Sequence, residues 1–123
     1  MKALILEGSN MNQATERVKE FLTGPIKGTY IDNCSHGYLA VSLKDFKRVM
    51  TPETAKKITG YSGLNSSTVY LEEDLDAGTF MEEAKTKGIE IEVTNSYNER
   101  FQCPKNYTAR KVKFDAEFIP NAN

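Results

Sequence analysis

The order of hydrophobic and polar residues predicts short strands and short helices along the whole chain. Apolar or alternating runs predict strands at residues 2–7, 28–32, 37–41, 68–71, 89–93 and 111–118. Apolar spacings of three and four predict helices at residues 10–22, 42–50, 51–58 and 77–87. We therefore expect an α+β fold, a single compact domain at residues 1–119 with a mostly antiparallel sheet packed with three to four short helices. Residues 120–123 are expected to form a frayed tail.

Residues that favour helix ends support these boundaries. Asn10 and Ser42 are suited to the N-cap, where a short polar side chain accepts a hydrogen bond from a free backbone N–H. Thr51 followed by Pro52 is typical of a helix start, and Gly88 is typical of a helix stop. In the helix at 77–87, the spacing places three residues on the inward face: Phe80, Met81 and Ala84.

Composition narrows the function classes without naming one. The formal net charge is −1, from sixteen basic and seventeen acidic residues, so the chain lacks the basic excess typical of proteins that bind nucleic-acid polymers. No apolar run is long enough to span a membrane, and no signal peptide is recognisable. We therefore expect a cytoplasmic protein in which Cys34 and Cys103 are reduced thiols.

Two features could support catalysis or metal binding, and each has a simpler explanation. His36 is the only histidine, and neither a metal cluster nor an activating third group accompanies it. The acids at residues 72–76 follow a calcium loop only loosely, because Ala77 stands where the loop needs glycine. Acids at a helix start are stabilising without a metal, since they meet the positive end of the helix dipole. We therefore expect no catalytic residue, no metal and no cofactor.

Arg110 is the most unusual charge in the predicted elements. In an unbroken last strand it shares the face of Val112 and Phe114, and a charge aimed at an apolar face is costly unless paired. Arg110 could extend to the surface, pair with an acid such as Glu72 or Asp74, or contact a ligand phosphate. Alternatively, a bulge in the strand would turn Arg110 outward above a solvated loop.

The irregular segment before Arg110 combines cations, amides and aromatic rings. Such a mixture suits a nucleotide, because rings stack on the base and guanidinium groups bind phosphate. We expect the adjoining stretch at residues 61–80 to position two more aromatic residues near the same pocket. The predicted ligand-binding residues are Arg110, Tyr107, Asn106, Lys105, Phe101, Arg100, Asn98, Tyr61 and Phe80.

Three stretches resemble a family of short phage and prophage proteins. They are His36-Gly37-Tyr38-Leu39-x-Val41-Ser42, Ile58-x-Gly60-Tyr61-Ser62, and Val69-Tyr70-Leu71-Glu72-Glu73-Asp74-x-Asp76-Ala77-Gly78-x-Phe80. A basic-Asn-Tyr element like Lys105-Asn106-Tyr107 ends that family's chains, so the resemblance covers residues 34–107. The chain is also similar to the phage Thoeris anti-defence sponge proteins of the first-described type.

The resemblance implies a non-enzymatic phage protein that binds cyclic ADP-ribose signals in the bacterial cytoplasm and holds them uncleaved. It further implies uptake of cyclic oligonucleotides of the CBASS system by some members, and assembly as a dimer or hexamer. Two alternatives stay open. The chain could be a phage inhibitor that docks on a host defence protein through its acidic run, or a small enzyme that uses His36 or an acid of residues 72–76.

Overall fold

The computed structural model describes residues 24–114 of the chain. The predicted strand at 2–7 and helix at 10–22 lie outside these residues, as do the end of the predicted last strand and the predicted tail. The described residues form a five-stranded sheet, two α-helices and two 3₁₀ helices. This arrangement confirms the predicted α+β fold, with slightly fewer helices among the described residues than we expected.

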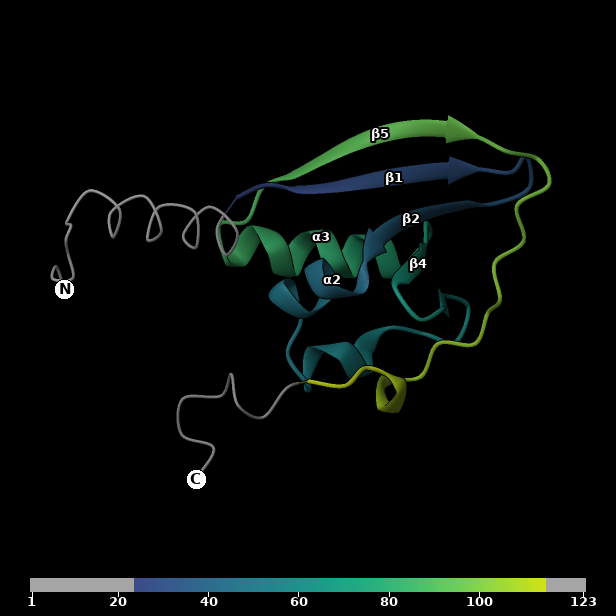
Figure 1. The fold of residues 1–123 in the computed structure, drawn as a ribbon. Coiled ribbons are helices and arrows are strands. Elements are labelled where there is room, and N and C mark those ends of the chain that lie inside the picture. Colours follow the sequence, from purple (N-terminus) through teal and green to yellow (C-terminus); the bar gives the residue numbers. More distant parts are fainter. Residues whose placement is uncertain (1–23, 115–123) are drawn as a thin grey trace, which may run out of the picture.

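The sheet has the strand order β3-β4-β2-β1-β5, and Figure 1 shows β5 beside β1 at one side of the molecule. Its strands are β1 (Ile26–Asp32), β2 (Gly37–Ser42), β3 (Gly63–Leu64), β4 (Thr68–Glu72) and β5 (Ile91–Tyr97). The pairs β1–β2, β2–β4 and β3–β4 are antiparallel, whereas β1–β5 is parallel. Helix α3 (Asp76–Thr86) supplies the crossover from β4 to β5 that such parallel pairing requires.

One face of the sheet carries the hydrophobic core. Alternate residues of β2 and β4 point to this face, where α2 (Leu43–Val49) and α3 cover them. The rings of Phe46 in α2 and Phe80 in α3 are stacked in parallel with their centroids 5.9 Å apart, and both are fully buried. Burial of such aromatic side chains supplies much of the hydrophobic free energy of a small domain.

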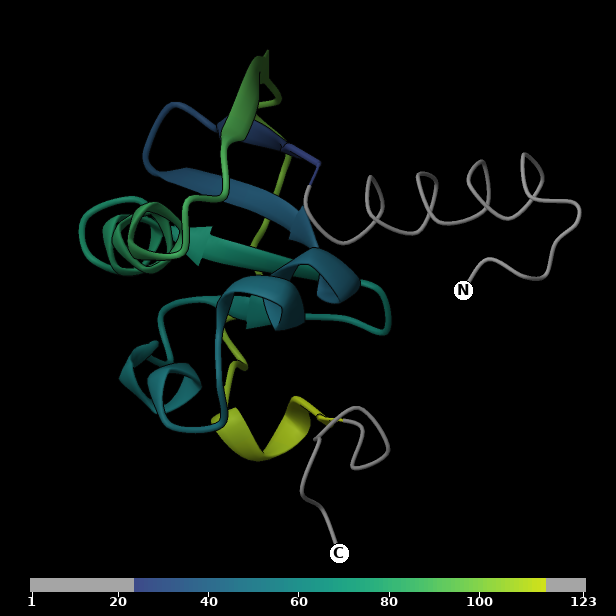
Figure 2. The same ribbon diagram turned by 90° about the vertical axis from the view of Figure 1, so that its left-hand side faces the viewer.

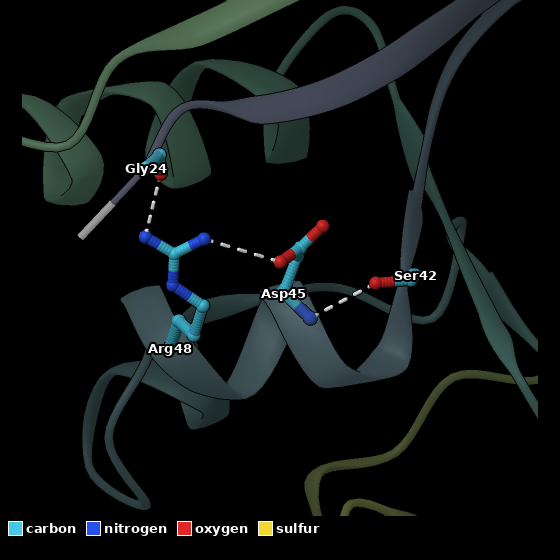
Figure 3. A network of polar contacts seen from close by, with 4 residues as sticks. All are labelled: Gly24, Ser42, Asp45 and Arg48. Atoms are coloured by element: carbon cyan, nitrogen blue, oxygen red, sulfur yellow. Dashed lines mark hydrogen bonds and ion pairs between the residues drawn. The ribbon is translucent and has the colours of Figure 1, made fainter. Parts of the chain in front are cut away.

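A polar network joins α2 to Gly24, which lies just before β1 (Figure 3). The Ser42 hydroxyl accepts a 3.0 Å hydrogen bond from the backbone N–H of Asp45, which confirms Ser42 as the N-cap of α2. The Asp45 carboxylate lies 3.3 Å from the Arg48 guanidinium, which also donates a 2.8 Å hydrogen bond to the carbonyl of Gly24. Arg48 therefore joins the helix to the first described residue of the chain.

The opposite face of the sheet is covered by the irregular segment at residues 98–108, which follows β5. The Phe101 ring lies across this face, with its centroid 5.6 Å from that of Tyr38 in β2 and 5.0 Å from that of Tyr70 in β4. Further along, the segment approaches β3 so closely that a Cβ on Gly63 would lie 2.8 Å from Cys103 Sγ. In Figure 1 the segment descends from the end of β5 to the 3₁₀ helix η2 (Ala109–Lys111).

Three local predictions differ from the structure. Residues 109–111 form η2, and residues 112–114 are irregular, so the predicted last strand is wrong over its described part. The predicted helix at 51–58 is instead the 3₁₀ helix η1 (Thr54–Lys57), although the Thr51 hydroxyl still accepts a hydrogen bond from the Thr54 N–H at 3.1 Å. Met81 was predicted to face the core but is 42% exposed, because it lines a hollow at the edge of the sheet together with Val93.

Candidate functional site

Two of the residues that we predicted to bind a ligand lie in the core. Phe80 is fully buried, and Tyr107 is 3% exposed, with its ring centroid 6.0 Å from that of Phe46. The Tyr107 hydroxyl donates a 2.7 Å hydrogen bond to the carbonyl of Ala55. Burial, with a smaller effect from Asp76, raises the pKa of Tyr107 well above its usual value. Both rings stabilise the fold in this structure, since neither offers surface on which a ligand could stack.

The two predicted amides form hydrogen bonds to the backbone. Asn106 accepts a 2.8 Å hydrogen bond from the N–H of Leu64 and donates a 3.1 Å hydrogen bond to the carbonyl of the same residue. Its side chain therefore occupies the outer edge of β3 as a further strand would. Asn98 accepts a 3.1 Å hydrogen bond from the N–H of Arg100 and shapes the turn that follows β5.

We expect Asn106→Ala to lower the free energy of unfolding by about 1–3 kcal/mol, because the backbone groups of Leu64 lose both partners. Lys105→Ala is the matched control, since that neighbouring side chain is exposed, and its change should stay within about 0.5 kcal/mol. Urea unfolding of both variants measures the difference. If the two variants have equal free energies of unfolding, the two Asn106 hydrogen bonds make no net contribution to stability.

The three predicted cations and Tyr61 remain accessible. Arg100, Lys105 and Arg110 are exposed, and none of them forms an ion pair with a carboxylate within residues 24–114. Arg110 thus points outward, contrary to the strand parity, because η2 turns the backbone at this position. Tyr61 is 67% exposed, and its carbonyl lies 3.9 Å from Cys103 Sγ. The cations are spread along one segment rather than gathered around a single hollow.

A buried carboxylate that we did not predict connects α3 to the loop before β3. Asp76 is fully buried in the first turn of α3. It accepts hydrogen bonds from the Thr59 N–H at 3.1 Å, the Thr59 hydroxyl at 2.6 Å and the Ser62 hydroxyl at 2.6 Å. Ser62 in turn accepts a 2.9 Å hydrogen bond from the N–H of Glu72. A substrate cannot reach the buried Asp76 carboxylate, so its role is to hold the loop before β3 against α3.

The remaining acids of the run at 72–76 also serve local structure. The Glu72 carboxylate accepts hydrogen bonds from the backbone N–H of Asp74 at 3.0 Å and of Leu75 at 3.2 Å, just before α3 begins. Glu73 accepts a hydrogen bond from the hydroxyl of Tyr30 in β1. In the part of the chain that the structure describes, no three acids, histidines or cysteines converge as metal ligands would.

Two adjoining hollows lie on the helix side of β1 and β5. The first has a volume of about 350 Å³ and is lined by Tyr30, Leu39, Ala77, Met81, Val93 and Asn95. The second, of about 340 Å³, is lined by Tyr30, Asp32, Asn95, Ser96 and Tyr97. Their shared residues make one continuous groove, which we call the β5 groove. Its lining is mostly apolar and aromatic, with one amide and one carboxylate. No cation lines the groove, so the phosphates of a nucleotide would have no positively charged partner there.

The alternation of apolar and polar residues at 89–93 also predicts that one face of this strand is buried, and the structure corrects that prediction. Its apolar residues alternate as predicted, yet Val93 is 42% exposed and Tyr97 is 61% exposed. Helix α3 packs under β4, β2 and the beginning of β1, while β5 extends past it at the sheet edge (Figure 2). The strand is therefore not half-buried within the described residues.

The two thiols differ in their surroundings. Both are free; Cys34 is exposed in the turn between β1 and β2, whereas Cys103 is partly covered against Gly63. Burial raises the pKa of the Cys103 thiol, and the opposing effect of Lys105 is smaller. A raised pKa keeps the sulfur protonated near neutral pH, where a nucleophile would need to be a thiolate.

Comparison with known proteins found no protein-family model, no curated protein and no solved structure that matches this chain. No helix among residues 24–114 has the length and apolar character needed to cross a membrane. Several residues that carry the resemblance to short phage proteins have structural roles here, notably the buried Tyr38 and the Ser62–Asp76 pair.

Proposed function

We propose that the chain is a non-enzymatic phage anti-defence protein that binds a cyclic nucleotide signal in the host cytoplasm and holds it intact. The observation that carries the proposal is the exposed surface of residues 98–111, where Arg100, Lys105 and Arg110 lack carboxylate partners within residues 24–114. Unpaired guanidinium and ammonium groups on one segment suit a ligand that carries two phosphates. The resemblance to the Thoeris sponge family supplies the ligand class, glycocyclic ADP-ribose, and extends it to cyclic oligonucleotides.

The positions of the nine predicted residues narrow the proposed contact set. Phe80 and Tyr107 are buried, and Asn106 and Asn98 bond to the backbone, so the proposal now depends on the three cations and on Tyr61. Tyr61 supports it because its ring is exposed and could stack on a base, and its backbone carbonyl lies 3.9 Å from Cys103 Sγ, near the middle of the cationic segment at residues 98–111. Phe101 contributes by holding the segment on the sheet through its contacts with Tyr38 and Tyr70.

The test is to mix the protein with glycocyclic ADP-ribose, separate the complex from free ligand and heat it. Intact ligand released on heating supports the proposal, and altered ligand would instead reveal an enzyme. We expect Arg110→Ala to weaken retention about tenfold or more, because one charged hydrogen bond contributes about 1.5–3 kcal/mol. The melting temperature should change little, because Arg110 is exposed.

Lys85→Ala is the matched control, because this exposed cation lies on α3, away from the segment. It should retain ligand as the wild type does. If Arg110→Ala and Lys85→Ala bind equally well, the cationic segment is not the site. If the wild type retains no ligand at all, the nucleotide proposal is wrong.

Docking on a host defence protein is the second candidate function. It is favoured by one observation: Leu75 is 59% exposed directly after the exposed acids Glu73 and Asp74. An apolar residue beside acids is a combination that protein interfaces use. In the retention experiment this candidate predicts no bound nucleotide, while a Leu75→Asp variant should lose anti-defence activity without loss of stability.

A further inference from the structure

The β5 groove is an apolar surface that no element within residues 24–114 covers. Leu39 and Val93 of the sheet line it, and Ala77 and Met81 of α3 form its side. Met81 and Val93 are each 42% exposed, although each is a large apolar side chain. Contiguous apolar surface that stays open to water commonly marks a contact site. The groove therefore suits an occupant that is itself apolar.

The chain just before residue 24 contains a second apolar surface in its sequence. The helix that the spacing predicts at residues 10–22 has apolar residues three and four positions apart on one face: Met11, Ala14, Val18, Phe21 and Leu22. A helix this short is only marginally stable in water by itself, and in proteins its stability comes mostly from packing of the apolar face. The predicted helix therefore needs a surface against which to pack.

Two hydrogen bonds establish where residues 10–22 must end. The Arg48 guanidinium of α2 donates a 2.8 Å hydrogen bond to the carbonyl of Gly24, so the chain enters β1 from the helix side of the sheet (Figure 3). The Ile26 N–H donates a 2.8 Å hydrogen bond to the carbonyl of Glu90, just before β5 begins. The end of the predicted helix therefore lies beside the first residues of β1 and β5, on the face that bears the β5 groove.

The lengths of the helix and the groove agree. A helix at residues 10–22 is about 20 Å long at 1.5 Å per residue. Strand β5 has seven residues and is about 23 Å long at the rise of a strand. The glycine and proline at 24–25 favour a reversal, so the helix can run back along β1 and β5. Four helical residues span about as much as two strand residues, so Val18 comes level with Val93 when Leu22 lies beside Ile91.

The charges of the predicted helix are complementary to the groove. At helical spacing Arg17 and Lys19 flank the apolar face, whereas Glu16 and Glu20 lie on the opposite side of the helix. The residues that line the groove include the carboxylate of Asp32 and no cation. A helix seated in the groove thus brings its cations toward the acid of the lining and keeps its own acids in water.

We propose that the predicted helix at residues 10–22 docks in the β5 groove of its own chain, with its apolar face against α3 and β5. The covalent connection at Gly24 favours this occupant over any free partner, because a short tether holds a segment at an effective concentration on the order of millimolar. The proposal does not depend on nucleotide binding, since the segment at residues 98–108 covers the opposite face of the sheet.

Cross-linking in the full chain tests the docked face. With Cys34 and Cys103 replaced by serine, the pair Val18→Cys and Met81→Cys should be joined by a short bismaleimide, and the product should have the mass of one chain. The pair Glu20→Cys and Met81→Cys is the matched control, because residue 20 has the same tether but lies on the opposite side of the predicted helix. Equal cross-linking of the two pairs overturns the proposal, and a product with the mass of two chains assigns the groove to another copy instead.

Thiol reactivity in the same cysteine-free background tests whether the groove is covered. Met81→Cys should react with a maleimide about tenfold more slowly than Glu82→Cys, its exposed neighbour in α3, because the docked helix covers only the first position. Adding Val18→Asp should raise the rate at Met81→Cys about tenfold, since the helix loses an apolar contact and gains a charge.

Glu16→Ala is the control for Val18→Asp, because Glu16 lies on the opposite side of the predicted helix, and it should leave the rate at Met81→Cys unchanged. Circular dichroism confirms that each variant is folded. If Val18→Asp unfolds the chain, Val18→Ala takes its place and should raise the rate by a smaller factor. A rate at Met81→Cys that does not respond to either change at Val18 overturns the proposal.

Discussion

Phe80→Ala is expected to lower the free energy of unfolding by about 3–5 kcal/mol, the usual cost of removing a fully buried aromatic side chain. Phe80 has no exposed surface, and its ring stacks on Phe46 at 5.9 Å between α2 and α3. Its removal leaves a cavity between the two helices that cover the sheet. Urea unfolding, read as the shift of the midpoint at constant slope, measures the loss.

Met81→Ala is the matched control for this experiment. Met81 is the next residue of the same helix and is 42% exposed, so its truncation should cost less than about 1 kcal/mol. Phe80→Leu keeps the fold with a smaller loss and allows ligand retention to be measured. If Phe80→Leu retains the nucleotide normally, the result agrees with the core position of Phe80. If a stable Phe80→Leu variant no longer retains the nucleotide, Phe80 belongs to the ligand site after all.

Asp76→Ala is expected to lower the free energy of unfolding by about 3 kcal/mol. The change removes one acceptor from three donors, the Thr59 N–H and the hydroxyls of Thr59 and Ser62. Each donor left buried without a partner costs about 1–3 kcal/mol. Ser62 is fully buried, so water cannot easily replace the carboxylate there.

Asp74→Ala is the control for Asp76, because this acid stands two residues earlier and is exposed. We expect its stability to stay within about 0.5 kcal/mol of the wild type. The double change Ser62→Ala with Asp76→Ala should cost less than the sum of the two single changes, since both remove the same hydrogen bond. Additive losses would contradict a direct Ser62–Asp76 interaction.

Local signals in the sequence were sufficient for most of the secondary structure. Ser42 was predicted as an N-cap and accepts the expected hydrogen bond, and Gly88 was predicted as a helix stop and adopts a φ of +70°. Both features depend on a few neighbouring residues, which periodicity and capping preferences describe well. The parallel pairing of β1 with β5 was not predicted, because nothing local indicates which strand becomes the neighbour of β1.

The candidate site was harder to predict, because exposure is a property of the folded chain. Tyr107 and Phe101 lie in the same irregular segment, yet one inserts into the core and the other covers the outer face of the sheet. Asp76 is one of four acids in a run, and only tertiary structure distinguishes the buried member from the exposed ones. The strand parity that aimed Arg110 inward failed for the same reason, since residues 109–111 form η2 instead of a strand.

The parallel contact between β1 and β5 has a consequence for the order in which the domain assembles and opens. Ile26 pairs with Ile91, and the chain between these two residues contains β2, β4 and α3. Contacts between residues distant in sequence carry the largest loop-closure entropy and form late. Strand β5 also buries little side-chain surface, so we expect a low free energy of local opening for this strand. We therefore expect strand β5 to join the sheet late and to leave it early.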